Sequence, residues 1–224
     1  MRTFLRENAL TLFFIGLLLL ALVGQAVSGL AEFNSQQVSS GQDAIPLGAY
    51  LVSSDFAADV AENWQSEFLQ FFLYILATVW FVQKGSSESK EPGHGGLGTD
   101  EEQRVGPYAD EGSPAWARTR GWRLHVYANS LGLVMGVIFL LCWLAESVAG
   151  RAAYNAEQLR GYEDPVTWFG YLGSADFWSR TLQNWQSEFL AVAAMASFAI
   201  YLRQRGSPES KPVGTPHDST GDEG

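Results

Sequence analysis

The sequence predicts an all-α integral membrane protein in which four transmembrane helices form two tandem helical hairpins. Three observations lead to this prediction. The apolar residues are gathered in four blocks, and the peptide Asn-Trp-Gln-Ser-Glu-Phe-Leu occurs unchanged at 63–69 and 184–190. Lys and Arg lie mainly at one end of each apolar block, as they do in multi-span proteins with alternating loops.

The doubled peptide is the centre of an internal repeat. Its offset is 185 − 64 = 121 residues, measured at Trp64 and Trp185. Roughly a third of the positions in 8–90 recur at this offset without a gap, which indicates a true repeat. Recurring positions are candidates for a shared role. The offset pairs Asn8 with Asn129, Gly29 with Gly150, Asn34 with Asn155, Tyr50-Leu51 with Tyr171-Leu172, Asp55-Phe56 with Asp176-Phe177, Gly85-Ser86 with Gly206-Ser207 and Glu88-Ser89-Lys90 with Glu209-Ser210-Lys211.

The first crossing is expected at residues 9–28, since about 20 mainly apolar residues are enough to span a bilayer. A secretory signal peptide is the rival interpretation, because Arg2 and Arg6 precede the block and small residues follow it. The repeat favours an uncleaved helix, because the matching segment 129–150 lies in mid-chain, where no signal peptide acts.

A polar loop without Lys or Arg follows at residues 30–60. A helix is expected to begin within 53–55, where Ser and Asp can cap free amide groups. This helix continues through 68–82 as the second crossing. Lys84 followed by Gly85 is typical of a helix C-terminus.

Residues 86–118 are rich in Gly, Ser, Pro and acidic residues, a composition that predicts a flexible, disordered linker. The second copy repeats the order of elements, with a third crossing, a loop and a shorter fourth crossing. Their expected positions are 126–148, 151–183 and 185–202. The predicted organisation is repeat 1 at 1–90, the acidic Gly-rich linker at 91–117, repeat 2 at 118–212 and a disordered tail at 213–224.

The cations set the predicted topology. Both termini and the linker carry them and are expected on the cytoplasmic side by the positive-inside rule, with the two long loops outside. Each copy crosses twice, so the two copies share one orientation and form a parallel repeat. The cations concerned are Arg2, Arg6, Lys84, Lys90, Arg118, Arg120, Arg123, Arg203 and Arg205.

Polar residues near the outer ends of the helices form the candidate site. An intramembrane carboxylate is costly unless it faces protein or a water-filled cavity. We predict a polar cluster of Gln25, Glu67, Glu146, Glu188, Gln65 and Gln186. The repeated motif adds Asn63, Trp64, Ser66, Asn184, Trp185 and Ser187. These groups either hydrogen-bond between helices or bind a proton or cation; the sequence leaves both alternatives open.

Two further features are candidates for structural roles. Gly132 and Gly136 form a GxxxG pattern, which indicates close helix packing. We interpret the repeated Glu88-Ser89-Lys90 stretch as a cap and solvated tail, with partner docking as the alternative.

Composition limits the classes of function. The net charge is −10, which argues against nucleic acid as a partner. One cysteine and three scattered histidines offer no metal-ligand spacing. No cofactor motif and no nucleophile–base pair is recognisable in the sequence. We therefore expect that the protein binds no cofactor and has no enzymatic activity.

The chain resembles an uncharacterised family of small bacterial four-span membrane proteins, defined only as a domain of unknown function. The resemblance rests on Arg6-Glu7-Asn8, the doubled NWQSEFL peptide, the Tyr-Leu-x-Ser loop and the segment from Arg205 to Pro212. It implies a bacterial cytoplasmic membrane and supplies no activity.

The first functional hypothesis is a structural or accessory multi-pass membrane protein. Its expected partners are the lipid bilayer and either a second copy or another membrane protein. The alternative is a small proton or cation transporter or channel that uses Glu67 and Glu188.

Overall fold

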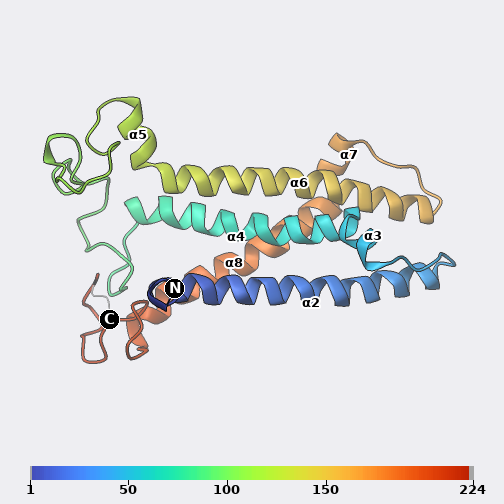
Figure 1. Ribbon diagram of the computed structural model, residues 1–224, viewed down its shortest axis with the longest axis horizontal. Coiled ribbons are helices and arrows are strands. Elements are labelled where there is room, and N and C mark those ends of the chain that lie inside the picture. The colour runs from blue at the N-terminus through green and yellow to red at the C-terminus, as the bar shows by residue number, and fades with distance from the viewer. Residues whose placement is uncertain (1, 222–224) are drawn as a thin grey trace. The chain divides into compact units, whose positions relative to one another are not determined.

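The computed structural model describes residues 2–221, and within them every regular element is helical (Figure 1). The all-α class is thereby confirmed for this part of the chain. Met1 and the last three residues of the predicted tail, 222–224, lie outside the described residues. The elements are α1 (Arg2–Glu7), α2 (Ala9–Ser39), α3 (Leu47–Leu51), α4 (Ser54–Trp80), the 3₁₀ helix η1 (Gly106–Tyr108), α5 (Trp122–Ala128), α6 (Ser130–Arg160), α7 (Trp168–Leu172) and α8 (Ala175–Tyr201).

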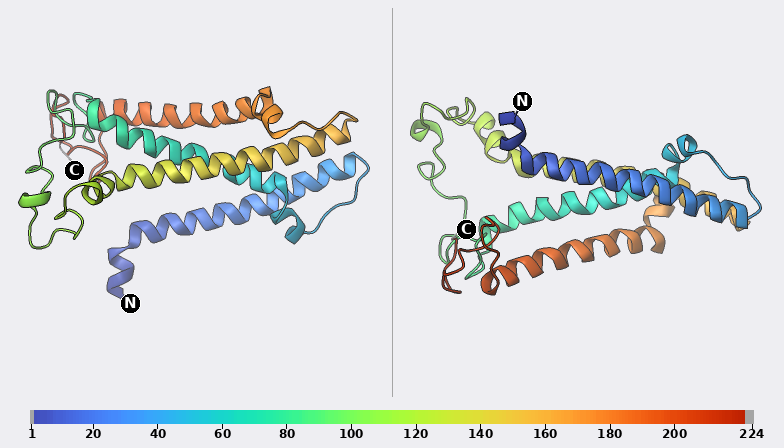
Figure 2. Two further views of the ribbon diagram at one scale, coloured as in Figure 1. Left: turned by 90° about the horizontal axis from the view of Figure 1, so that it is seen from above. Right: turned by 60° about the horizontal axis from the view of Figure 1, so that its bottom comes forward.

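The four long helices are α2, α4, α6 and α8, in two hairpin-like pairs (Figure 2). α2 and α6 have 31 residues each, or about 46 Å of helix, against a hydrocarbon thickness of about 30 Å. The expected first and third crossings ended at residues 28 and 148, so both helices run about three turns further than expected. No proline interrupts either extension, and the apolar run ends before the helix does.

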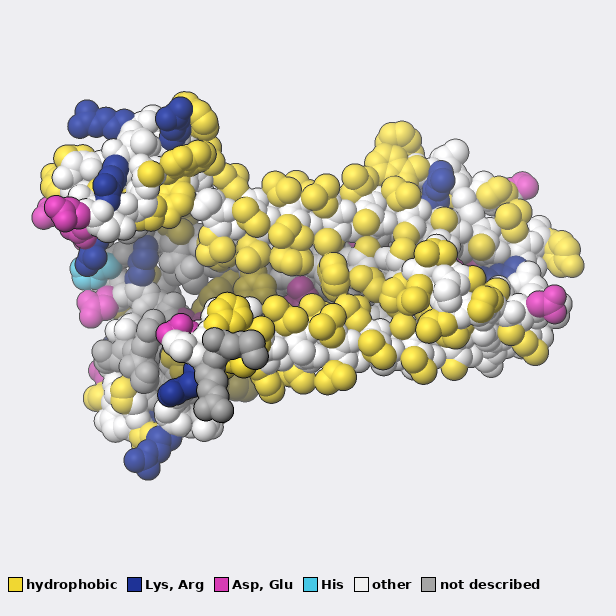
Figure 3. Space-filling view, viewed as in Figure 1, with side chains coloured by type: hydrophobic (Ala, Val, Ile, Leu, Met, Phe, Trp, Pro, Cys, Tyr) yellow, Lys and Arg dark blue, Asp and Glu magenta, His cyan; other side chains and the backbone are white. Residues whose placement is uncertain are grey.

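Two of these helices, α2 and α6, are long and apolar enough to cross a membrane. Hydrophobic side chains cover the visible surface along α2 (Figure 3). α4 and α8 are not among the candidate spans of the described residues. The reason lies in their sequences, because each begins with several polar and acidic turns before its apolar half.

The chain divides into two compact units that cut across both repeats. The first unit comprises Met1–Ala61 and Ala145–Phe177, and the second comprises Glu62–Leu144 and Trp178–Gly224. The first therefore holds all of α2 and both loops, and the second holds the linker and most of α4 and α8.

In the first unit, each loop is folded back by one asparagine. Asn34 Nδ2 donates to the Ile45 carbonyl at 3.0 Å, and its Oδ1 accepts from the Ile45 amide at 2.8 Å. Asn155 makes the same two bonds to Val166, at 3.0 and 2.8 Å. A side-chain amide thus replaces a backbone partner at the same position of both copies, which satisfies two loop groups at once.

A buried tyrosine closes each loop against a glycine of the long helix. Tyr50 and Tyr171 are 2% and 1% exposed. A Cβ placed on Gly29 would overlap the Tyr50 hydroxyl, and one on Gly150 would come within 2.5 Å of the Tyr171 hydroxyl. Only glycine lets the ring approach the helix this closely.

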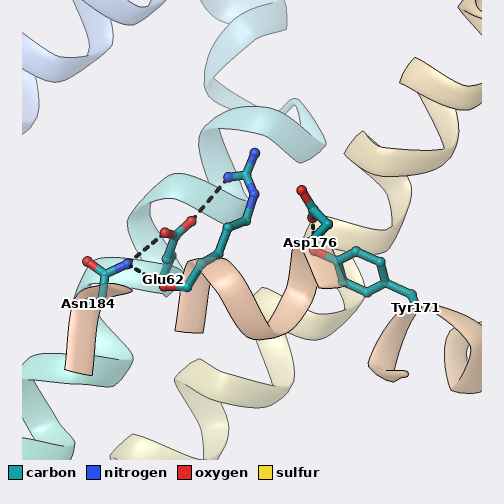
Figure 4. A network of polar contacts seen from close by, with 5 residues as sticks. Glu62, Tyr171, Asp176 and Asn184 are labelled. Atoms are coloured by element: carbon teal, nitrogen blue, oxygen red, sulfur yellow. Dashed lines mark hydrogen bonds and ion pairs between the residues drawn. The ribbon is translucent and has the colours of Figure 1, made fainter. Parts of the chain in front are cut away.

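The loops then lead into the next long helices in the same way. Ser53 Oγ accepts from the Phe56 amide and Ser174 Oγ from the Phe177 amide, both at 3.2 Å. The predicted helix start within 53–55 is confirmed, and the cap is the expected serine. Tyr171 also donates to Asp176 at 3.1 Å (Figure 4).

Each long first helix is preceded by a short one that ends at an asparagine. Asn8 Nδ2 donates to the Phe4 carbonyl at 2.9 Å, and Asn129 Nδ2 donates to the His125 carbonyl at 2.8 Å. Such a bond from side chain to backbone competes with the helical ladder and interrupts it. α1 and α5 are therefore equivalent elements of the repeat.

In the second unit, α4 packs against α6 at the GxxxG pattern. A Cβ on Gly136 would lie 2.9 Å from the Phe72 ring, whereas one on Gly132 would lie 3.7 Å from Leu76. The predicted close packing is confirmed, with Gly136 as the tighter of the two contacts.

α4 and α8 both end in a folded turn rather than a solvated tail. Ser89 Oγ accepts from the Gln83 amide at 2.7 Å, and Ser210 Oγ accepts from the Gln204 amide at 2.9 Å. Gly85 has φ +87° and lies within this turn. It is not the residue that ends the helix, as Lys84-Gly85 had suggested, because α4 stops at Trp80 and the serine folds the following segment back.

The linker holds local structure within the described residues. Thr99 and Glu102 exchange bonds in a capping-box arrangement, with Thr99 N donating to Glu102 Oε2 at 2.7 Å and Glu102 N to Thr99 Oγ1 at 3.2 Å. The bonds that Thr99 donates to this carboxyl, from its amide and from its hydroxyl at 3.1 Å, lower the pKa of Glu102. The disorder expected for the linker and the tail stays a prediction.

Candidate functional site

The two copies of the repeated motif meet in the second unit, between α4 and α8. Trp185 Nε1 donates to Gln65 Oε1 at 2.8 Å, and Gln65 is fully buried. The Ser66 hydroxyl lies 2.9 Å from the Asn63 carbonyl and 3.5 Å from Glu188 Oε1. Because a hydroxyl has one proton, the shorter bond within α4 dominates and the contact with Glu188 is the weaker.

An ion pair one turn earlier joins the same two helices. Arg180 lies 3.2 Å from Glu62, and Asn184 Nδ2 donates to the other Glu62 oxygen at 2.6 Å (Figure 4). Glu62 is mostly covered, whereas Arg180 is about half exposed. Both carboxylate oxygens are thus used, so Glu62 fixes the register of α8 against α4.

Aromatic side chains extend the contact to α6. The Phe139 and Trp143 rings stack at 5.7 Å, and Trp143 also meets Trp178 at 6.1 Å and Trp185 at 5.9 Å. Trp143 Nε1 lies 3.5 Å from the hydroxyl of Thr181, which is fully buried. These tryptophan rings are part of the packing between α6 and α8.

The contact is asymmetric although the motif is identical in both copies. Gln65 and Ser66 are buried, whereas their equivalents Gln186 and Ser187 are exposed. The residues around the motif differ between the two copies, so the identical peptides have different neighbours. At the offset of the repeat, Leu22 corresponds to Trp143, Leu18 to Phe139, Ala57 to Trp178, Asp59 to Arg180 and Glu62 to Gln183.

The predicted polar cluster is divided between the two units. Gln25 and Glu146 belong to the first, where Glu146 is buried and Gln25 half-buried. The other members, Glu67, Glu188, Gln65 and Gln186, belong to the second. A cluster of all of them stays a prediction.

Within the second unit, the motif residues have different environments. Glu67 and Trp64 are exposed, and Glu188 and Trp185 are half-buried. Ser187 Oγ donates to the Asn184 carbonyl at 2.8 Å, which repeats the bond between Ser66 and Asn63. The Nε2 donor of Gln65 is buried and has no acceptor among the described residues.

Sequence reasoning missed Glu62 and Arg180. It interpreted the stretches that contain Glu88 and Glu209 as a cap and solvated tail, with partner docking as the alternative. The signal for the first pair was a difference between the two copies, since position 59 holds an acid and the equivalent position 180 holds a base. The signal for the second pair was retention of the same acid in both copies.

The fold and the motif contact define the class: an all-helical protein built from two tandem, diverged helical hairpins. The chain belongs to the family described as Domain of unknown function (DUF6766), which matches residues 1–222. No curated protein and no solved structure shows significant similarity to the chain.

Proposed function

We propose that this protein is a four-span membrane protein with a structural or accessory role, held together by contacts between its two copies. The observation that carries the proposal is the exposure of α2. Only 6% of its most apolar stretch is buried, and Leu10 and Leu20 are 73% and 70% exposed. Exposing such a surface to water costs about 25 cal/mol per Å² of apolar area, so a lipid environment is energetically more favourable for it.

α6 strengthens this interpretation. A signal sequence near the N-terminus passes the same test of length and composition as α2, but α6 lies in mid-chain and repeats the pattern. Val137, Leu140 and Leu141 of α6 are exposed, which argues against the interior of a water-soluble core.

The contact between the motif copies supports α4 and α8 as the other two spans. Their uncharged runs after the motif are short, about 20 Å for residues 68–80. A full crossing therefore includes the polar motif, and polar groups at that depth need protein partners. Trp185 with Gln65 and Arg180 with Glu62 are such partners.

The proposed location is a bacterial cytoplasmic membrane, with the termini and linker on the cytoplasmic side. The proposed partners are lipids, followed by a second copy of the chain or another membrane protein. The accessory role rests on the use of the motif for packing, since several of its polar atoms bind neighbouring helices.

Cysteine labelling tests the topology. In a Cys142→Ser background, intact cells carrying Gln42→Cys, Asp100→Cys or Glu163→Cys are treated with a membrane-impermeant maleimide. Four spans predict labelling at 42 and 163 but at 100 only after lysis. If α2 and α6 alone cross, 42 and 100 will be labelled together while 163 is protected, which would contradict the proposal.

The alternative is transport of protons or cations by Glu67 and Glu188. It is supported by the position of Glu188 beside Ser66 and by the buried Nε2 donor of Gln65, which would suit a bound water. Liposomes containing the protein would show a flux that disappears in Glu67→Gln/Glu188→Gln. Absence of flux under any imposed gradient would exclude transport and support the accessory role.

A further inference from the structure

A second feature of the second unit lies at the other end of α4 and α8, where the two repeated Gly-Ser-x-Glu-Ser-Lys turns meet. The Gly85 amide donates to Thr220 Oγ1 at 2.8 Å, and the Gly221 amide donates to the Ser86 carbonyl at 3.0 Å. The Ser87 hydroxyl lies 3.5 Å from the Glu209 carbonyl oxygen, so the two turns and the described part of the tail form one connected structure.

A cavity of about 330 Å³ opens beside these turns, between α4 and α8. Every residue that lines it belongs to a pair related by the repeat. The pairs are Gln70 with Ala191, Phe71 with Val192, Tyr74 with Met195 and Glu88 with Glu209. The cavity thus lies between equivalent positions of the two copies, and its two carboxylates are the repeated glutamates.

The lysines next to these glutamates are occupied elsewhere. Lys211 Nζ donates to the carbonyls of Pro216, His217 and Ser219 at 3.1, 2.9 and 3.0 Å. Lys90 Nζ donates to the Gly96 carbonyl at 2.5 Å. Glu88 forms no ion pair with a described residue and accepts a hydrogen bond from the Tyr74 hydroxyl. Both ammonium groups donate to backbone carbonyls, whereas the side chains of Glu88 and Glu209 line the cavity.

We propose that this cavity binds a monovalent ammonium group that carries a small apolar body. Two carboxylates and the aromatic rings of Phe71 and Tyr74 suit a cation, while Val192 and Met195 provide an aliphatic wall for the rest of the ligand. The volume is at the lower end of small-molecule sites. No group of three or more His, Cys, Asp or Glu that could hold a metal ion occurs among the described residues.

The ammonium group has two sources, a free alkylamine or the ethanolamine headgroup of a lipid. The amine site stands on the geometry of the second unit and does not require the proposed four-span topology. Failure of the labelling experiment would therefore leave the amine site intact.

Calorimetry on the full-length protein in detergent tests the free amine, with hexylammonium and the neutral hexanol as probes. We expect hexylammonium to bind at least about tenfold more tightly than hexanol, as for a hydrogen bond to a charged group. Glu88→Gln/Glu209→Gln should lose this difference, because glutamine keeps the acceptor for Tyr74 without the charge. Glu101→Gln/Glu111→Gln removes two exposed charges from the linker and should bind as the wild type does.

Val192→Phe fills the cavity without changing charge and should also abolish binding, which provides a second variant if the first is unstable. Nanodiscs with phosphatidylethanolamine or phosphatidylglycerol distinguish the sources. Retention of phosphatidylethanolamine by the purified wild type, lost in Glu88→Gln/Glu209→Gln, identifies the headgroup. Equal affinity for hexanol and hexylammonium, or equal loss in the linker control, would overturn the proposal. So would binding of neither amine source by the wild type.

Discussion

At the scale of single residues, the retained positions of the repeat have physical roles that the two copies share. Gly29 and Gly150 admit a tyrosine hydroxyl, and Asn34 and Asn155 each bind both backbone groups of one loop residue. These are sites where one side chain, or the lack of one, decides whether the loop closes. Their neighbours tolerate change because they only need to be helical or apolar.

The substitution Gly29→Ala should destabilise the protein by about 1–3 kcal/mol, the usual cost of overpacking, because its Cβ would overlap the Tyr50 hydroxyl. Chemical unfolding in detergent measures this. Gly16→Ala in the same helix is the matched control, since nothing lies within 4 Å of its Cβ; it should leave stability unchanged or raise it. Equal effects of the two variants would contradict the closure of the loop on Gly29.

Tyr50 should make stability sensitive to alkaline pH. Burial raises the pKa of its phenol, and the carboxylates of Asp59 and Asp55 raise it further. The folded pKa therefore exceeds the unfolded value of about 10. The stability contributed by the neutral phenol is present below pH 10 and is lost as pH rises through the folded pKa.

Unfolding measured from pH 8 to 12 checks this expectation. Tyr50→Phe should flatten the alkaline decline relative to the wild type. Tyr162→Phe, at a fully exposed ring, should follow the wild-type curve. The same slope in all three proteins would exclude Tyr50 as the cause.

At the scale of elements, contacts of α4 with α6 and α8 hold the second unit together. α6 packs against α4 through Gly136, which leaves room for the Phe72 ring. α8 packs against α4 through Trp185, which donates a hydrogen bond to the buried Gln65 side chain. Apolar patterning alone does not fix such contacts, since many rotations of a helix bury a similar apolar area.

For the contact with α6, Gly136→Ala should destabilise the protein by about 1–3 kcal/mol, because the new Cβ would lie 2.9 Å from Phe72. Gly132→Ala places its Cβ 3.7 Å from Leu76, an ordinary contact, and should change stability by less than about 0.5 kcal/mol. Thermal unfolding of the two variants in one detergent provides the comparison, and a larger loss at Gly132 would refute this packing.

For the contact with α8, Trp185→Phe should cost about 1–3 kcal/mol, because Gln65 Oε1 would lose its donor while it stays buried. The equivalent change in the other copy, Trp64→Phe, affects an exposed ring and should cost much less. Denaturant midpoints of both variants test the asymmetry directly. Equal losses would show that the two copies of the motif act alike.

At the scale of the whole molecule, the second unit joins segments from both repeats, so the covalent linker should contribute little to their association. A protease site inserted after Glu111 allows the linker to be cut in the folded protein. The two fragments should stay together through size-exclusion chromatography, because α4 contacts both α6 and α8. The cleaved Gly136→Ala/Trp185→Phe double variant should separate more readily. Separation of the cleaved wild type would contradict this.

The helical class, the repeat, the helix cap at Ser53 and the close packing at Gly136 could all be predicted from the amino-acid sequence. These depend on local rules: composition, periodicity, capping and residue size, each of which acts over a few residues. The sequence also identified the retained positions, although it could not say which partners they had.

The packing of the helices, by contrast, pairs Glu62 with Arg180, buries Gln65 while Gln186 stays exposed, and brings Glu88 and Glu209 to one cavity. Identical peptides take different environments because burial depends on the neighbouring helices, and those neighbours have diverged. Partners more than 100 positions apart in the chain are selected by packing geometry, which no local pattern encodes.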